Sequence, residues 1–432
     1  MNIFSKILPA SLCFLAISSC SNSDDSLMNF KNAPDSSKTS ADIKLNKIFE
    51  FVNEAKEQIY GTSSRSTNSE IDISNVQYQL GFQSRGNDND TLFYAINFKN
   101  NEGFALVSFS ETEPELIAIT EKGSYPFEKG QIGGLDQYID NVISTLSERG
   151  IKDSIIVRPG TDFDDGDLVQ YKTERIVLDD IKHEPDYTKC WGQRFPEGIY
   201  FANGSCGCTN TGMLIILSYF KYPSSIKLEF PEYSNEDLIL NWDAINRHKV
   251  SGDYYYPYSD ICESTTHQMI GKLCRQLGYL NNSVCKEDKQ TTTLAEKPAQ
   301  TFNKLGLNAI GLQPYDFNRI VNTLSNSGLI LAHGKNSSTT NTYHVWVIDG
   351  YKYTKIWSGE YIKEPGKDWV LINDHGIKET QLVHVNWGYN GDMNGYFVSD
   401  QFNTTTATQY DNSNQHIIKE KYYNIKIDIV NR

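Results

Sequence analysis

The stretch SCGCTNTGMLIILSYFKYP, residues 205–223, decides how this chain is expected to fold. A Cys-Gly-Cys precedes an unbroken apolar run that ends at Tyr222-Pro223. The pattern predicts a buried helix, because proline cannot continue one. Cys208 then lies at the first helical turn, where unpaired backbone N–H groups and the helix dipole favour an anion. The position favours a thiolate, although a small buried cysteine that caps a core helix has the same pattern.

A thiolate nucleophile needs a basic partner, and His344 is the best candidate. It begins an apolar run that predicts a strand, and it follows Cys208 by 136 residues. Papain-like cysteine and histidine pairs are separated by roughly 130–150 residues. A structural histidine on a strand is the alternative. Another histidine, His384, is expected to be structural or peripheral.

Two further segments supply groups that such a pair requires. Asn386 and Trp387 lie in HVNWGYNGDMNGYF, residues 384–397, and an amide or an indole beside an imidazole can fix its tautomer. A glycine-rich hairpin with a core tryptophan is the alternative for this segment. Gln193, in Trp191-Gly192-Gln193, can donate a hydrogen bond to a tetrahedral oxyanion together with the Cys208 backbone N–H.

These motifs, in this order, resemble the streptopain family of bacterial secreted cysteine peptidases, which have a papain-like fold. The matching segments are residues 191–193, 207–223, 344–351 and 384–397, and residues 92–98 and 102–108 resemble the family's inhibitory prodomain. The resemblance implies that Cys208 is the nucleophile, His344 the general base and acid, and Gln193 the oxyanion donor. It leaves open whether Asn386 or Trp387 orients the histidine.

The chain departs from the family pattern at positions expected to bind substrate. Tyr343 stands where the family has glycine before the histidine, and it is expected to narrow the primed side of the cleft. Residues 290–293, which include Thr291 and Thr292, replace a Gly-Ser-rich substrate loop. The resemblance therefore implies substrate contacts from Tyr343, Thr291 and Thr292, without identifying the preferred substrate.

The N-terminus predicts export. Lys6 and the apolar residues 7–17 precede Ile17-Ser18-Ser19-Cys20, which resembles a bacterial lipobox in which Cys20 is lipidated. An ordinary signal peptide cut elsewhere is the alternative. The net charge of −14 argues against nucleic acid and against a polybasic membrane-surface protein. We expect a lipoprotein of the outer membrane or cell surface, held in the membrane through the lipid on Cys20.

The cysteines give no metal site. Once the signal is removed and Cys20 lipidated, six remain, enough for three disulfides; a thiolate at Cys208 leaves at least one other cysteine unpaired. Cys-Gly-Cys lacks the spacing of zinc ribbons, and no second paired motif exists. We expect no metal and no cofactor.

The hydrophobic pattern predicts an α+β protein with a papain-like two-lobed peptidase domain after a smaller α+β prodomain. The expected parts are a signal peptide (1–20), a flexible tether (21–40), the prodomain (41–165) and the peptidase domain (166–432). Helices are expected at 41–60, 135–146, 208–222, 264–277, 294–305 and 315–324. Strands are expected at 76–82, 92–98, 104–109, 329–332, 344–348, 369–372, 382–386, 396–399 and 424–429.

The sequence therefore predicts the zymogen of a cysteine endopeptidase that cleaves proteins or peptides, with its own prodomain as an intramolecular inhibitor. Cleavage between about residues 160 and 186, in an acidic linker or at Lys172-Thr173-Glu174-Arg175, would activate the enzyme and release it from its anchor. Two alternatives stay open: a cell-wall amidase or acyltransferase that uses the same dyad, and a degenerate peptidase that acts as a binding module.

Overall fold

The computed structural model describes residues 40–60, 71–80, 91–110, 113–125, 133–149, 170–183, 191–247, 264–287, 290–335, 343–363, 367–402 and 425–432. The expected signal peptide with Cys20, most of the tether and the acidic stretch at 158–167 lie outside these residues. Residues 37–432 group into one compact unit. Among the described helices, none is long and apolar enough to cross a membrane.

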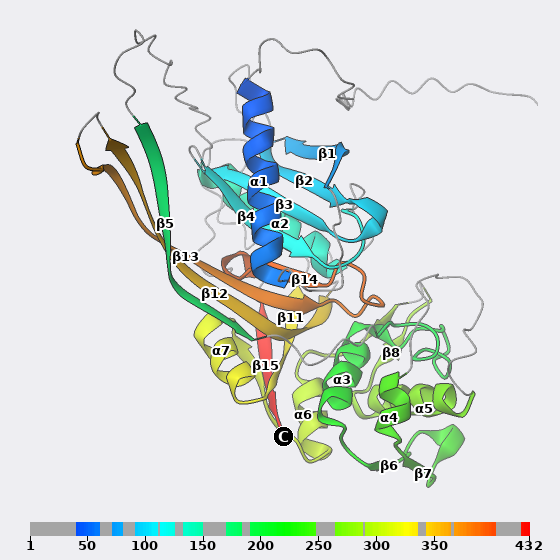
Figure 1. Ribbon diagram of the computed structural model, residues 1–432. Helices are drawn as coiled ribbons and strands as arrows, with labels where there is room; N and C mark the ends of the chain where they lie inside the picture. The colour runs from blue at the N-terminus through cyan, green and yellow to red at the C-terminus, as the bar shows by residue number, and fades with distance from the viewer. Residues whose placement is uncertain are drawn as a thin grey trace, which may run out of the picture. The chain divides into compact units, whose positions relative to one another are not determined.

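The N-terminal part is an antiparallel meander with a helix on each face. Its elements are α1 (Ser40–Tyr60), β1 (Ile71–Leu80), β2 (Thr91–Phe98), η1 (Lys99–Asn101), β3 (Phe104–Ser110), β4 (Glu113–Thr120) and α2 (Gly133–Arg149). Helix α1 lies across one face, where Ile48, Val52 and Ile59 are buried (Figure 1). Leu135, Tyr138 and Val142 of α2 are buried on the other. The expected helices and three strands are present, and β4 was not predicted.

The C-terminal part begins with mostly helical elements. They are α3 (Gly207–Phe220), β6 (Ser225–Lys227), η2 (Pro231–Tyr233), β7 (Asp237–Ile239), α4 (Trp242–Arg247), α5 (Ser264–Leu280), β8 (Val284–Cys285), β9 (Thr291–Thr292) and α6 (Lys297–Lys304). A sheet-forming half follows, with β10 (Asn308–Pro314), α7 (Phe317–Ser325), β11 (Leu329–Lys335), β12 (Tyr343–Lys363), β13 (Val370–Asn386), β14 (Gly395–Val398), η3 (Ser399–Phe402) and β15 (Lys426–Asn431). The α+β class expected from the sequence is confirmed.

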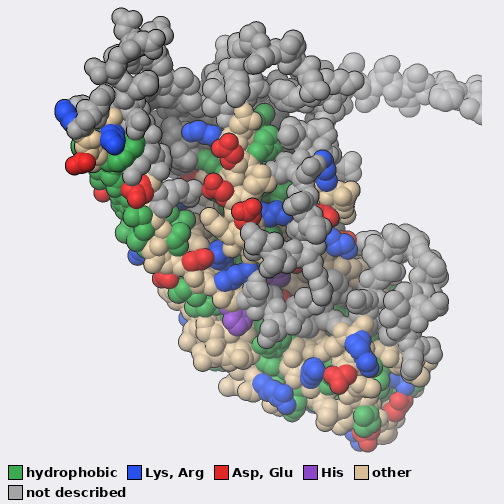
Figure 2. Space-filling view, viewed as in Figure 1, with side chains coloured by type: hydrophobic (Ala, Val, Ile, Leu, Met, Phe, Trp, Pro, Cys, Tyr) green, Lys and Arg blue, Asp and Glu red, His purple; other side chains and the backbone are tan. Residues whose placement is uncertain are grey.

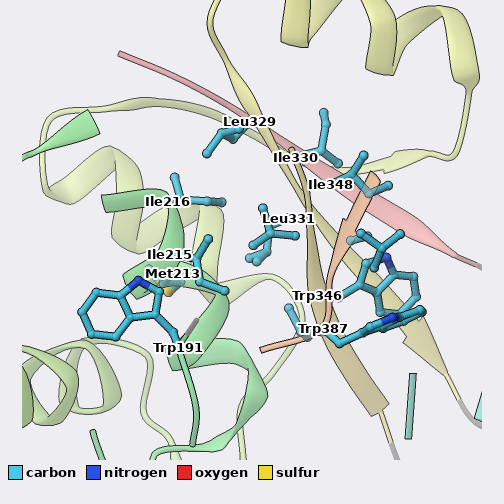
Figure 3. Close-up of a cluster of buried hydrophobic side chains, with 14 of the residues drawn as sticks. Trp191, Met213, Ile215, Ile216, Leu329, Ile330, Leu331, Trp346, Ile348 and Trp387 are labelled. Carbon is cyan, nitrogen blue, oxygen red and sulfur yellow. The ribbon is translucent and has the colours of Figure 1, made fainter. Parts of the chain in front are cut away.

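One sheet runs through both parts of the chain, in the order β1-β2-β3-β4-β14-β13-β12-β11-β15-β10. The junction is the antiparallel pairing of β4 with β14. Helix α3 packs against the sheet, and Figure 3 shows Met213, Ile215 and Ile216 facing Leu331 and its neighbours on β11. Trp191 lies on one side of this cluster, and Trp346 and Trp387 lie on the other (Figure 3).

The long strands correct the sequence prediction. Residues 370–372 and 382–386 belong to the single strand β13, and β12 extends far beyond 344–348. β5 (Gln170–His183), which was not predicted, pairs with β12 from Gln170↔Lys363 to His183↔Tyr351. The segment 172–175, expected as exposed and flexible, is therefore part of a strand. The outer ends of these strands are exposed to solvent. Their sequences therefore lack the alternation of apolar and polar residues that indicates a half-buried strand. Apolar side chains along them are exposed (Figure 2).

Candidate active site

Cys208 is the second residue of α3, as the sequence predicts. Gly207 before it has φ = 81°, and a Cβ there would stand 2.5 Å from the carbonyl oxygen of Thr291. Only glycine fits this left-handed turn against the neighbouring main chain. The backbone thus turns sharply into the helix and presents the thiol at the helix N-terminus.

The Cys208 thiol lies beside the residue that follows the candidate base. Its sulfur accepts a hydrogen bond from the backbone N–H of Val345. Burial raises the pKa of Cys208 above its ordinary value, and the hydrogen bonds from Val345 and Thr209 only partly offset this effect. The fold therefore brings together two segments 136 residues apart in the sequence, with the thiol uncharged near neutral pH.

His344 stands near the start of β12, opposite Gly334 of β11, and its side chain is buried. Burial lowers the pKa of His344 to about 4, although the Trp387 backbone accepts a hydrogen bond from the ring. Its Nε2 has no hydrogen-bond partner among the described residues. The rings of Tyr389, Trp346 and Trp387 surround the imidazole at centroid distances of 5.4, 6.2 and 6.4 Å. His344 is therefore neutral and screened from water.

Trp387 contacts the imidazole through its main chain and its ring. Its indole Nε1 donates to the carbonyl of Met393 at 3.1 Å, which fixes the ring. Asn386 is buried, and its side-chain oxygen accepts a hydrogen bond from Gly388 N at 3.1 Å. That contact closes the Asn-Trp-Gly turn, so the asparagine shapes the loop that carries Trp387.

Gln193 is positioned beside the start of α3 by main-chain contacts. Its carbonyl accepts from Cys206 N at 2.8 Å, and the carbonyl of Gly192 accepts from Thr211 Oγ1 at 3.0 Å. The carbonyl of Trp191 accepts from Asn390 N at 2.9 Å, which ties the same segment to the loop after Trp387. The side chain of Gln193 is partly buried. The structure therefore gathers all five predicted catalytic residues in one region.

The predicted substrate-binding residues have different surroundings. Thr291 is buried, and its hydroxyl donates to the carbonyl of Ser205 at 2.6 Å, so it supports the loop before the nucleophile. Thr292 is partly buried and pairs with Val284 between β9 and β8. Tyr343 pairs with Lys335 through its main chain, and its side chain lies outside the described part. Substrate contact by Thr291, Thr292 and Tyr343 stays a prediction.

Sequence reasoning missed the helix that covers the histidine. A Cβ on Gly134, near the start of α2, would stand 2.5 Å from Cδ2 of His344 and 2.4 Å from Cζ3 of Trp387. Any larger residue at this position would have to displace one of these rings. The N-terminal part of the chain thus lies directly on the candidate base. Only the glycine pair at 133–134 hinted at a close approach in the sequence.

His384 belongs to an ionic cluster in which His384 and Asp349 are buried and Glu121 is half-exposed. Its Nδ1 lies 2.6 Å from Asp349 Oδ1, and its Nε2 lies 3.5 Å from Glu121 Oε1. Burial alone would lower the pKa of His384, but the charges and hydrogen bonds of Asp349 and Glu121 raise it to about 10. Glu121 follows β4, whereas Asp349 and His384 lie on β12 and β13. The cluster therefore joins the N-terminal part of the chain to the C-terminal sheet.

The described part contains three further cysteines. Cys206 is fully buried, and its sulfur lies 3.1 Å from Thr211 Oγ1. Cys206, Cys274 and Cys285 carry free thiols, and Cys190 and Cys262 lie outside the described ranges. In these ranges no group of three or more His, Cys, Asp or Glu side chains is arranged to hold a metal ion.

A thiol at the N-terminus of a buried helix, a histidine on the facing strand and an Asn-Trp-Gly turn define a cysteine peptidase of the papain-like class. The model of the Peptidase C10 family matches residues 185–397, which contain all of these elements. Over these residues the chain is similar to the Peptidase C10 family. The family and the enzyme class expected from the sequence, a cysteine-type endopeptidase, are confirmed.

Two solved structures are similar to the chain. A fragment of Prevotella intermedia prointerpain A matches with a TM-score of 0.47 and 17% identity, over 82% of this chain and 98% of that one. The active interpain A cysteine protease of the same organism matches with a TM-score of 0.35 and 17% identity, over 58% of this chain and 94% of that one. No curated protein matches the chain.

Proposed function

We propose that residues 166–432 hydrolyse peptide bonds through a dyad of Cys208 and His344, and that residues 41–165 keep this enzyme latent. The observation that carries the dyad is the hydrogen bond from Val345 N–H to the Cys208 sulfur, which brings the thiol to the residue beside His344. The observation that carries latency is the contact of Gly134 with the His344 ring.

Catalysis starts with transfer of the Cys208 proton to His344, which gives a thiolate and an imidazolium. The thiolate attacks the carbonyl carbon of the substrate, and Gln193 with the Cys208 backbone N–H stabilises the oxyanion. His344 then protonates the leaving amine, and the resulting thioester is hydrolysed by a water molecule that His344 deprotonates. The Trp387 backbone, which accepts a hydrogen bond from the ring, orients the imidazole and stabilises its charge.

The intact chain opposes the first of these steps. Burial raises the pKa of Cys208 and lowers that of His344 to about 4, so neutral forms of both groups are favoured at pH 7. Helix α2 excludes solvent and substrate from the imidazole. Removal of the N-terminal part exposes His344 to water, which restores its basicity and favours the ion pair.

We further propose that Cys20 carries a lipid that anchors the precursor at the outer membrane or cell surface. The support is the sequence Ile17-Ser18-Ser19-Cys20 after an apolar segment. Cleavage between the two parts of the chain would then release the catalytic part from the membrane. Replacing Cys20 by Ser should abolish incorporation of a labelled fatty acid and should release the precursor into the soluble fraction.

Expression of the chain from Ser21 onward tests the catalytic assignment, with Cys208→Ala and Cys206→Ala as matched variants. The unmodified protein should cleave itself and digest denatured casein, and Cys208→Ala should do neither. Cys206→Ala should retain a substantial fraction of the activity, because its thiol is buried against Thr211. Equal loss in both variants with the fold intact would contradict the assignment. Release of peptidoglycan fragments without casein digestion would favour an amidase.

A further inference from the structure

Strand β14 is the edge at which the N-terminal part joins the C-terminal sheet. Gly395, Tyr396 and Phe397 pair antiparallel with Thr120, Ile119 and Ala118 of β4. On its other side, β14 pairs with β13. When the N-terminal part is removed, β14 loses β4 and keeps β13, so it becomes the edge of the sheet among the described strands.

Main-chain contacts continue on both sides of this pairing. Glu121 N donates to the carbonyl of Asn394 at 2.9 Å, and Met393 N donates to the carbonyl of Lys122 at 3.1 Å. At the other end, the Tyr138 hydroxyl donates to the carbonyl of Ile117 at 2.7 Å and accepts from Val398 N at 3.1 Å. The whole edge from 393 to 398 is therefore occupied by one extended segment and one tyrosine hydroxyl.

Both faces of the edge are apolar. Tyr396 and Leu382 are buried against Ile119 on the face covered by α1. Phe397 is buried on the opposite face with Ala118. Removal of the N-terminal part uncovers these side chains together with the free N–H and C=O groups of β14. A freed edge with apolar faces is a template for pairing with another strand.

The edge leads directly to the active site. Asn394 Oδ1 accepts a hydrogen bond from Trp387 N at 3.0 Å, and the Met393 carbonyl accepts from the Trp387 indole at 3.1 Å. Trp387 in turn contacts His344. In the intact chain one continuous segment both pairs with β14 through β4 and, from Gly134, covers the imidazole. A polypeptide bound at this edge therefore lies beside the residues that fix the Trp387 ring.

We propose that residues 393–398 of the mature enzyme bind an extended segment of the protein substrate that carries small or β-branched aliphatic side chains. The inference rests on the proposed removal of residues 41–165. Strand β4 occupies this edge in the intact chain, and its central residues Ala118 and Ile119 indicate that the edge accepts small or β-branched aliphatic side chains. Gly395 indicates main-chain recognition, because a Cβ there would stand 2.3 Å from the Ile119 carbonyl oxygen and 2.6 Å from the Thr120 Cα.

The probe is a fluorescent peptide with the sequence of residues 113–122, EPELIAITEK. The protein is the full chain with Cys208→Ala and a site-specific protease sequence inserted before Gln170, cut and then separated from its N-terminal part. Fluorescence anisotropy should show saturable binding. The same peptide N-methylated at Ile119 should bind at least tenfold more weakly, because Ile119 lies opposite Tyr396 in the ladder. Unfolded carboxymethylated casein should displace the probe.

Gly395→Ala is the matched protein variant, since the three atoms nearest to its methyl group in the intact chain all belong to the docked strand. It should weaken peptide binding at least tenfold, whereas Gly376→Ala, whose Cβ faces open space, should not. Circular dichroism and thermal melting check that both variants fold.

Equal binding to the Gly395→Ala variant, or failure of casein to displace the probe, would overturn the proposal. A concentration-dependent dimer that Gly395→Ala dissociates would assign the edge to a second copy and would also overturn it. The peptide-binding experiments use the Cys208→Ala protein and do not depend on catalysis. A failure of peptide-bond hydrolysis in the unsubstituted protein is therefore detected separately.

Discussion

Gly134 and His344 touch: a methyl group added to Gly134 would stand 2.5 Å from Cδ2 of the imidazole. The two residues are far apart in the sequence and meet because β4, the strand before α2, joins the C-terminal sheet at β14. The contact removes the base from water by packing alone.

Substituting Gly134 should weaken latency. In Gly134→Ala the new methyl group cannot fit without moving Trp387 or His344, and such overpacking typically costs about 1–3 kcal/mol. This cost should raise the fraction of molecules in which Cys208 is accessible to reagent roughly 5- to 100-fold, because each 1.4 kcal/mol changes an equilibrium about tenfold. The rate of iodoacetamide alkylation of Cys208 in the uncleaved chain measures this change. Asp136→Ala on the same helix is the control, and an unchanged rate in Gly134→Ala would exclude the contact as the cause of latency.

The pH dependence of alkylation should differ between the intact and the cleaved protein. In the intact chain the pKa of Cys208 is raised and that of His344 is lowered to about 4, so the thiol is protonated and the imidazole neutral at pH 6. Alkylation should be slow there and should accelerate only in the alkaline range. After cleavage the thiolate–imidazolium pair should give rapid alkylation at pH 6, and His344→Ala should remove it. Identical profiles before and after cleavage would contradict the proposed effect of burial.

Gln193→Ala should lower kcat by about 10²–10³-fold with little change in KM, because an oxyanion donor acts mainly in the transition state. Steady-state kinetics of the cleaved enzyme on a short peptide substrate provide the measurement. Arg194→Ala changes the exposed neighbour and serves as the control. A loss confined to KM would assign Gln193 to ground-state binding.

His384→Gln should destabilise the intact protein, because it leaves the buried carboxylate of Asp349 without its ion-pair partner. Breaking a buried pair typically costs about 3–5 kcal/mol. The pKa of His384 is raised from 6.5 to about 10, so the folded state holds its proton more tightly than the unfolded state does. The stabilisation is complete below about pH 6.5 and is lost as the pH rises toward 10. The melting temperature of His384→Gln should be lower than that of the unsubstituted protein at pH 7, and the difference should become smaller by pH 10. A difference that stays constant with pH would contradict the charged state of His384.

The mature N-terminus should fall between residues 160 and 170. The sequence predicts cleavage between about 160 and 186, but Gln170–His183 pairs with β12 along its whole length. A paired strand must first unfold before a protease can bind it, so a cut outside β5 is favoured. N-terminal sequencing of active material provides the measurement. A first residue within 171–190 would show that β5 is cut or leaves with the N-terminal part. A full-length active chain would contradict the zymogen proposal.

Local sequence determined the parts of the active site. Cys-Gly-Cys before an apolar run that ends at proline fixes both the helix and the cysteine at its start, because capping and periodicity act within a few residues. His344 and Trp387 were recognised for a similar reason: each lies in a short motif with its own chemistry. The α+β class and the separate N-terminal unit followed from hydrophobic periodicity, which depends on which face of an element is buried.

Tertiary structure decided the protonation states of these residues and which of them are buried. Nothing near His344 in the sequence indicates burial under Gly134, since that contact depends on the pairing of β4 with β14. The raised pKa of His384 likewise depends on Asp349 and Glu121, and these three residues come from three different segments of the chain. Periodicity reports which face of an element is apolar, whereas pairing between distant strands is set by the packing of the whole chain. The sequence therefore indicated which residues are candidates for the chemistry, and the tertiary structure decided that His344 is buried under Gly134 and that the neutral forms of Cys208 and His344 are favoured in the intact chain.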